Sequence, residues 1–187
     1  VTNGMSEFAR DGRNANSGFL ANVLPEDIPG IADDPLAGVA LQRRCEQAAF
    51  AAGGGDYKAP AQLLTDFRAK VASRGAGHVQ PTYPLGVKWG SVGKCLPDFV
   101  DRALRAAFPI FAKRLEGFDR MDAVLTGVET RSSSPVRIVR RSDDLVSVDV
   151  EGLYPCGEGA GYAGGIMSAA ADGLRCAAAV VRAANAR

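Results

Sequence analysis

A glycine-dense segment near the end of the chain carries residue types that could do chemistry. Residues 152–166 read Gly-Leu-Tyr-Pro-Cys-Gly-Glu-Gly-Ala-Gly-Tyr-Ala-Gly-Gly-Ile, which predicts a short apolar strand, a loop at 157–165 and a helix from Ile166 onward. Glycine lets the backbone adopt positive φ and approach a ligand closely, and the N–H groups that begin a helix attract negative charge. Glu158 follows the predicted strand, where its carboxylate could accept hydrogen bonds from sugar-like hydroxyl groups. Taken alone, the loop fits a ligand site and a tight, ligand-free turn about equally well. It is neither a Walker A loop nor a Rossmann G-x-G-x-x-G fingerprint.

The other reactive side chains are few and scattered. His78 is the single histidine, and it has no neighbour to orient it, so we expect a surface position rather than a role as general base. The four cysteines form no C-x-x-C pair, so we expect no metal site and four free thiols in a reducing cytoplasm, although the spacing also permits two disulfides. No residue is assigned as a catalytic acid or base. The cysteines are Cys45, Cys95, Cys156 and Cys176.

Two groups close to the loop have a plain structural interpretation. Cys156 adjoins the loop, but a small buried hydrophobe is favoured over a redox thiol because no second cysteine is near it in the sequence. Four arginines upstream are expected on the wet face of strands, although they could attract an anionic substrate. They are Arg131, Arg137, Arg140 and Arg141.

Composition places the chain among folded proteins and excludes several function classes. Lys and Arg number 22 against 21 Asp and Glu, a net charge of +1, which argues against a nucleic-acid partner because phosphate binding needs a positive surplus. Hydrophobic residues make up 47% and charged residues 23%, which excludes a disordered acidic tail. No apolar run reaches the roughly 18 residues of a membrane span. The 187 residues suit one large domain or two small ones.

The pattern of apolar residues and turn formers predicts a mixture of helices and strands. Helices are expected at 36–52, after Asp34 and Pro35, and at 96–115, with a kink at Pro109. A third helix is expected at 166–184. Pro60 is expected in a turn, residues 62–72 could be strand or helix, and residues 75–93 should be mostly loop. Strands are expected at 19–24, 123–129, 136–140, 145–150 and 153–156.

The glycine segment resembles the C-terminal flavin motif of two-dinucleotide-binding-domain flavoproteins, and in particular that of a bacterial, largely uncharacterised branch of FAD-dependent dehydrogenases. Blocks further upstream resemble the same branch in the same order. They are Val1-Thr2-Asn3-Gly4-Met5-Ser6, Arg10-Asp11, Asn14-Ala15-Asn16-Ser17 and the run Thr126–Arg137. Together these blocks cover most of the chain, and their combination is specific. The resemblance implies that the parent protein is an FAD-dependent oxidoreductase.

The resemblance also implies roles for individual residues. Glu158 would bind a ribityl or nearby hydroxyl group of FAD, and the backbone from Gly161 to Ile166 would face the pyrimidine edge of the flavin. The dipole of the following helix would favour negative charge at N1 and the C2 carbonyl, which stabilises reduced flavin. Thr130, Arg131 and Ser132 would lie on the substrate side. The implied cofactor contacts are Gly157, Glu158, Gly159, Gly161, Tyr162, Ala163, Gly164, Gly165 and Ile166.

One part that such a flavoprotein needs is not in the sequence. There is no G-x-G-x-x-G fingerprint, no initiator methionine and no secretory signal, and Val1–Gly4 reads like the end of a strand entering a turn. We therefore predict a mixed α+β fold, a fragment of an FAD/NAD(P)-binding α/β fold that starts in mid-fold. Residues 1–122 would form the cap or substrate region. Residues 123–187 would supply returning strands, the flavin-binding loop and the C-terminal helix.

The expected partners follow from that prediction. They are the missing N-terminal FAD-binding half, a small-molecule substrate and, through exposed apolar surface, a second copy in a homodimer. The fragment alone would bind FAD weakly or not at all and would be inactive. Two other function classes stay open. One is a non-catalytic module that uses the glycine loop to bind a small anion or a partner protein. The other is a flavoprotein acting on RNA, which the near-neutral charge disfavours.

Overall fold

The computed structural model describes residues 5–186, which form two compact units. The first unit comprises residues 5–28 and 41–130, and the second comprises residues 29–40 and 131–186. The predicted strand end at Val1–Gly4 lies outside the described residues. The mixed α+β class is confirmed, since four α-helices accompany one small mixed sheet in the described residues. The chain divides after Thr130, whereas the sequence placed a boundary after residue 122. The roles of the two parts stay a prediction.

A three-stranded sheet lies in the first unit. The strands are β1 (Ala59–Leu63), β2 (Val87–Trp89) and β3 (Val124–Thr126), in the order β2-β1-β3. The central strand β1 runs parallel to β2 and antiparallel to β3. Its first four residues are all buried. A strand covered on both faces shows no alternation of polar and apolar residues, which is why the sequence did not reveal β1.

Pro60 lies inside this central strand, so the predicted turn at Pro60 is wrong. Proline has no N–H to donate, and such a residue is normally confined to edge strands or bulges. Here its carbonyl accepts a hydrogen bond from Gly127 N at 3.1 Å, while the ladder bonds toward β2 come from its neighbours, with Ala59 N donating to Gly86 O and Gly90 N donating to Ala61 O. The position therefore needs only the acceptor that proline retains.

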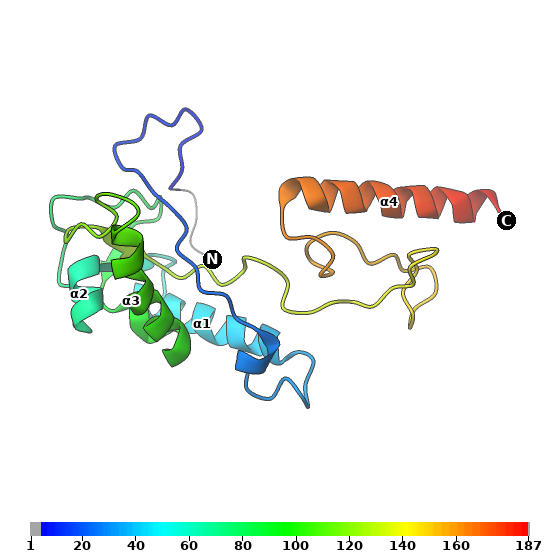
Figure 1. Cartoon of the computed structure of the whole chain (residues 1–187), viewed down its shortest axis with the longest axis horizontal. Coiled ribbons are helices and arrows are strands. Elements are labelled where there is room, and N and C mark those ends of the chain that lie inside the picture. The colour runs from blue at the N-terminus through cyan, green and yellow to red at the C-terminus, as the bar shows by residue number, and fades with distance from the viewer. Residues whose placement is uncertain (1–4, 187) are drawn as a thin grey trace. The chain divides into compact units, whose positions relative to one another are not determined.

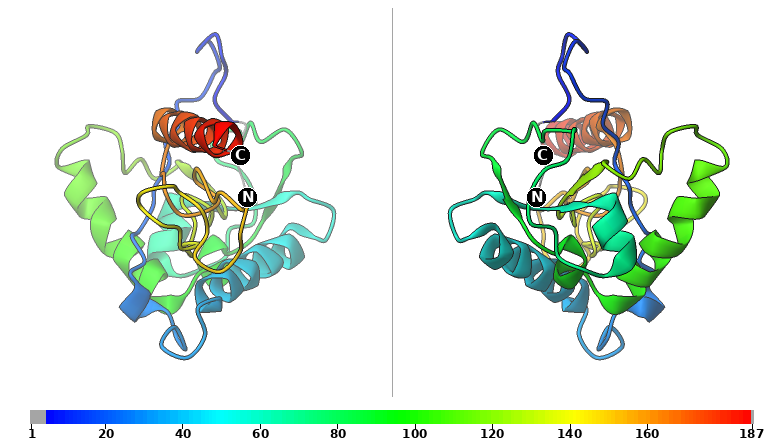
Figure 2. Two further views of the ribbon diagram at one scale, coloured as in Figure 1. Left: turned by 90° about the vertical axis from the view of Figure 1, so that its right-hand side faces the viewer. Right: turned by 90° about the vertical axis from the view of Figure 1, so that its left-hand side faces the viewer.

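The long helices agree with the sequence prediction. They are α1 (Ala37–Gly53), α3 (Asp98–Ala112) and α4 (Ile166–Asn185), joined by a short α2 (Leu64–Ala69) and two 3₁₀ helices, η1 (Pro25–Asp27) and η2 (Val92–Cys95). Asp34 Oδ1 accepts a hydrogen bond from Leu36 N at 2.8 Å, just before α1 begins at Ala37, so the predicted cap lies in the turn that leads into the helix. The open assignment at 62–72 resolves as the end of β1 followed by α2, and the stretch 75–93 is loop apart from β2 and the start of η2. Figures 1 and 2 show these elements.

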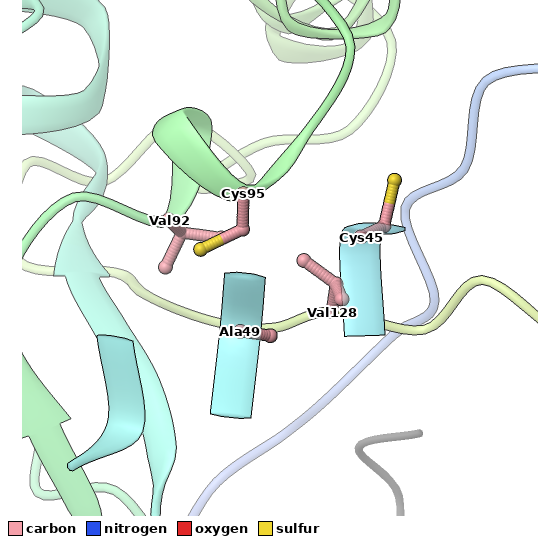
Figure 3. Packing of buried hydrophobic residues seen from close by; sticks show 5 residues of the cluster. All are labelled: Cys45, Ala49, Val92, Cys95 and Val128. Atoms are coloured by element: carbon pink, nitrogen blue, oxygen red, sulfur yellow. The ribbon is translucent and has the colours of Figure 1, made fainter. Parts of the chain in front are cut away.

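Two apolar clusters stabilise the first unit. One is built around phenylalanines: Leu64, Phe67 and Phe108 are at most 3% exposed, and Phe19 and Phe118 pack against them. The other joins α1, η2 and the segment after β3 (Figure 3). Its members are Cys45, Ala49, Val92, Cys95 and Val128.

The second unit contains no strand among its described residues, so the strands predicted at 136–140, 145–150 and 153–156 are wrong. A strand forms only where a neighbour pairs with its backbone groups, and here a single bridge joins Arg140 to Ser147. Leu145 has φ of 64°, outside the extended region. The strand predicted at 19–24 is wrong for the same lack of a ladder. The segment between β3 and α4 is drawn as coil (Figure 1).

Candidate functional site

The glycine loop is a tight turn directly before α4. Tyr162 N donates to Gly157 O at 3.0 Å and Gly161 N donates to Glu158 O at 2.9 Å. Gly157 and Gly161 have φ of 71° and 81°, in the left-handed region that favours glycine. A Cβ on Gly161 would lie 2.4 Å from Val136 O. Gly161 is therefore explained by packing and conformation within the protein.

Other glycines of the loop have no such explanation. A Cβ built on Gly159 or Gly164 meets no heavy atom within 4 Å, and one on Gly165 meets only Ser168 Oγ, at 3.8 Å. Both Gly159 and Gly164 are exposed. Packing among the described residues would thus accept a side chain at these positions. Small residues there leave open backbone that another molecule could approach.

The start of α4 is open in the same way. Gly165 is the N-cap and offers no side-chain acceptor, and the first turn carries no acidic residue. Ser168 Oγ donates to Gly165 O at 2.9 Å. The Ser168 hydroxyl group therefore donates its hydrogen bond to the carbonyl oxygen of the N-cap residue. The first amides of a helix have no partner within the helix, so this end carries partial positive charge, and its own first turn holds no acidic side chain to balance that charge.

Glu158 is exposed at the beginning of the loop. Among the described residues its carboxylate has no hydrogen bond and no ion pair. An ionised carboxylate accepts hydrogen bonds only, so Glu158 is free to accept them from hydroxyl groups of a bound molecule.

Residues 134–138, which include the start of the strand predicted at 136–140, wrap the loop. Arg137 Nε donates to Gly161 O at 3.0 Å, Ile138 N donates to Ala160 O at 3.2 Å, and Ser134 Oγ lies 3.2 Å from Gly159 O. Ala160 is buried as a result. This contact could not be predicted from the sequence, because the wrapping residues lie more than twenty positions upstream and the alternation at 136–140 suggested a half-buried strand.

The side chain of Tyr162 is engaged within the protein. Its hydroxyl accepts a hydrogen bond from Arg140 N and donates one to Ile138 O, each at 3.1 Å. Its ring lies under the Arg140 guanidinium, 3.7 Å from the centroid, with Arg137 at 5.1 Å. Tyr162 can therefore offer a ligand its backbone, as can the half-buried Ala163, whereas the side chain of Ile166 is 89% exposed.

A buried ion pair lies beneath the loop. Arg140 Nη2 is 2.6 Å from Asp172 Oδ1 and Arg140 Nη1 is 3.0 Å from Asp172 Oδ2, and the two side chains are 5% and 6% exposed. Hydrogen bonds from Arg140 hold the pKa of Asp172 at about 2 and the carboxylate in turn raises the pKa of Arg140. The prediction of a wet Arg140 is wrong. Asp172 was missed, although it is the single acidic residue of α4, which is a signal that could have found it.

Cys176 lies next to this pair on α4. It is buried, and burial raises the pKa of its thiol. Its neighbour in the fold is Cys156, which is exposed. The prediction of a buried Cys156 with no second cysteine near it is therefore wrong. All four cysteines are free thiols. Among the described residues no group of His, Cys, Asp and Glu could hold a metal ion.

The three residues predicted on the substrate side divide between the two units. Thr130 ends the first unit, where its carbonyl accepts a hydrogen bond from Gln42 Nε2 at 2.8 Å and its hydroxyl donates to Glu46 at 3.3 Å. Arg131 and Ser132 begin the second unit and are exposed. The positions of these three residues do not test whether they contact a substrate, so their role stays a prediction.

Comparison with known proteins places the chain in a family. Residues 1–132 match the family described as "FAD-dependent protein, C-terminal domain-like", and the chain belongs to this family. A protein from Clostridium beijerinckii described as "Uncharacterized protein" is 50% identical over 177 residues, which is 95% of this chain. The chain spans about a third of the length of that relative. The predicted identity as a C-terminal part of an FAD-dependent protein is thereby confirmed. Among the described residues, no helix has both the length and the apolar character to cross a membrane.

Proposed function

We propose that this chain is the C-terminal portion of an FAD-dependent oxidoreductase of the dehydrogenase type, and that residues 157–166 contact the flavin. One observation carries the proposal within the family assignment. Open glycine backbone leads directly into an uncapped helix start, beside an exposed carboxylate that has no hydrogen bond or ion pair with any residue of 5–186. A tight turn that served packing alone would need Gly157 and Gly161 but not Gly159 or Gly164.

The residues present fit FAD. Glu158 would accept a hydrogen bond from a ribityl or nearby hydroxyl group. The backbone of Gly164, Gly165 and Ile166 would lie against the pyrimidine edge, where the partial positive charge of the α4 start favours negative charge. FAD, when bound, supplies the two-electron chemistry. The other predicted contacts, including Tyr162 and Ala163, would act through their backbone.

The substrate is a small molecule that Thr130, Arg131 and Ser132 would help to bind. We assign no residue of this chain as a catalytic acid or base for the conversion of that substrate. The cytoplasmic location belongs to the same proposal, supported by the four free thiols, which a reducing compartment maintains.

The outer face of α4 supports the proposed partner, an N-terminal FAD-binding half. Asp172, Cys176 and Ala179 are the buried residues of α4, yet the opposite side is apolar too, with Ile166, Met167 and Leu174 each at least 74% exposed. Large apolar side chains that are this exposed on one face of a helix commonly mark a surface where another molecule binds. The relative's greater length leaves room for such a partner within one polypeptide. A homodimer would cover the same face.

The alternative function is a non-catalytic module that binds a small anion or a partner protein through the loop. The uncapped helix start would serve an anion equally well. Turnover of NADH or NADPH by the full-length protein separates the alternatives, because a binding module has no electron acceptor to reduce.

The test of the flavin contact is a titration of full-length apoprotein with FAD. We expect Glu158→Gln to weaken FAD binding about tenfold, because a charge-assisted hydrogen bond to a hydroxyl group is lost. Glu151→Gln is the matched control, since Glu151 is also an exposed carboxylate of the same unit, and it should bind FAD like the wild type. Equal affinities for the two variants would remove Glu158 from the site.

A further inference from the structure

The Arg140–Asp172 pair is exceptional within its unit. The Arg141–Asp144 pair nearby is equally short, at 2.6 Å, but its side chains are 47% and 46% exposed, whereas those of Arg140 and Asp172 are almost fully buried. Burying two charges carries a desolvation penalty, and an apolar pair of similar volume often stabilises a fold as well or better. Stability alone therefore does not explain why charges occupy this position.

The hydrogen bonds of the pair converge on both ends of the glycine loop. At the first end, Asp172 Oδ2 accepts a bond from Gly157 N at 2.9 Å and Arg140 Nη1 donates to Pro155 O at 2.6 Å. At the other end, the Arg140 guanidinium covers the ring of Tyr162 and Arg140 N donates to the Tyr162 hydroxyl. The pair thus connects α4 to the residues that enter and leave the turn.

We propose that Arg140 and Asp172 are positioning residues that hold the glycine loop in the conformation that receives the flavin, an inference that rests on the proposed function. Gly157 has positive φ, and its N–H is fixed by a carboxylate that α4 holds. Glu158 is the next residue, so the direction of its free carboxylate depends on that bond. The same helix α4 carries Asp172 and the uncapped N-terminus. One ion pair therefore sets the loop in register with the helix start.

The first measurement is amide hydrogen exchange of the full-length protein without FAD, resolved at Gly157. We expect the Gly157 amide to exchange at least tenfold more slowly than that of Gly159, for which the described residues provide no hydrogen-bond acceptor. Asp172→Asn replaces one of the two acceptor oxygens by an NH₂ group, which faces a donor of Arg140 in either orientation of the amide. The ion pair that holds the acceptor of Gly157 N is then lost, so the protection of Gly157 should decrease. Asp144→Asn, the exposed control, should keep it. An unprotected Gly157 amide in the wild type overturns the inference by itself.

The second measurement is binding of FAD to the same proteins. Asp172→Asn should raise the dissociation constant of FAD about tenfold and change the shape of the visible absorption bands at saturating FAD. A merely less stable protein would bind less FAD but show the wild-type spectrum once loaded. Asp144→Asn should match the wild type in both respects. Wild-type affinity and spectrum in Asp172→Asn would refute the positioning role.

A milder variant covers the case in which Asp172→Asn does not fold. Arg140→Lys keeps the cation but loses the planar fork that serves both oxygens of Asp172 and Pro155 O together. It should weaken FAD binding less than Asp172→Asn while still shifting the bound spectrum. An unchanged spectrum in a folded Arg140→Lys counts against the inference. If instead the wild type binds no FAD, the proposed function fails. The exchange of the Gly157 amide still shows whether Asp172 and Arg140 hold the loop.

Discussion

Each of the two units of this protein is stabilised internally by a different kind of interaction. The first unit has a hydrogen-bonded sheet and two apolar clusters, one of them dominated by phenylalanine rings. The second has one isolated bridge, a small apolar cluster of Leu145, Cys176 and Ala179, and a buried ion pair with its hydrogen bonds. Packing thus stabilises one unit, and polar contacts around a loop organise the other.

This difference between the units fits the proposal that the loop at 157–166 of the second unit contacts the flavin. Hydrophobic burial is non-directional and tolerates repacking, so it suits a scaffold. Hydrogen bonds to a buried charge fix geometry and are lost together when one partner is removed. A loop that must present backbone to a cofactor benefits from the second kind of restraint.

The largest expected effect is in the phenylalanine cluster. Phe108 is 3% exposed, and its ring centroid lies 4.4 Å from that of Phe19 and 5.9 Å from that of Phe118. Phe108→Ala should lower the free energy of unfolding of the first unit by about 3–5 kcal/mol, because it leaves a cavity among rings. Chemical denaturation followed by circular dichroism measures this. Phe8→Ala is the control, since Phe8 is fully exposed and should change stability by at most about 0.5 kcal/mol.

A smaller effect is expected at the glycine loop. Gly161→Ala combines positive φ with a clash against Val136 O, and we expect a loss of about 1–3 kcal/mol in stability of the second unit. Gly159→Ala has open space and should leave stability unchanged while it hinders FAD binding. Thermal unfolding and FAD titration of both variants separate packing from ligand contact. Loss of stability in both would mean that the loop serves packing throughout.

The smallest expected effect is that of lowering the pH, which acts on the Asp172 carboxylate. The pKa of Asp172 is lowered from 3.8 to about 2, so the charged carboxylate contributes stability that is present above the ordinary pKa and is lost as pH falls toward 2. Protection of the Gly157 amide should therefore stay constant from neutral pH to about 4 and decrease below it. Nuclear magnetic resonance of the Asp172 carboxyl group during a titration checks the same transition. A midpoint near the ordinary aspartate value would show that Arg140 does not hold the carboxylate.

The sequence predicted the long helices because each has strong local signals. Asp34 and Pro35 precede α1, an apolar face marks α3, and a glycine run precedes α4. It did not predict β1, whose residues are buried on both faces and include Pro60. It predicted strands at 136–150 from alternation alone, and alternation carries no information about whether a neighbouring strand exists. Local patterns thus reveal helices better than pairing.

The candidate site shows the same limit. The loop and Glu158 could be identified from residue types within a short window. The Arg140–Asp172 ion pair beneath the loop could not be identified from the sequence, because the two residues lie 32 positions apart. No spacing rule connects a coil residue to a helix. Only the fold shows that Gly157 donates to Asp172 and that Tyr162 faces inward.

The absorption spectrum of the full-length protein, purified without added flavin, tests the central claim most directly. We expect a yellow protein with stoichiometric FAD, whose colour bleaches when a reduced substrate or reduced nicotinamide is supplied. A colourless protein that also fails to take up FAD in a titration would contradict it, and residues 157–166 would then be a tight turn between a coil segment and α4.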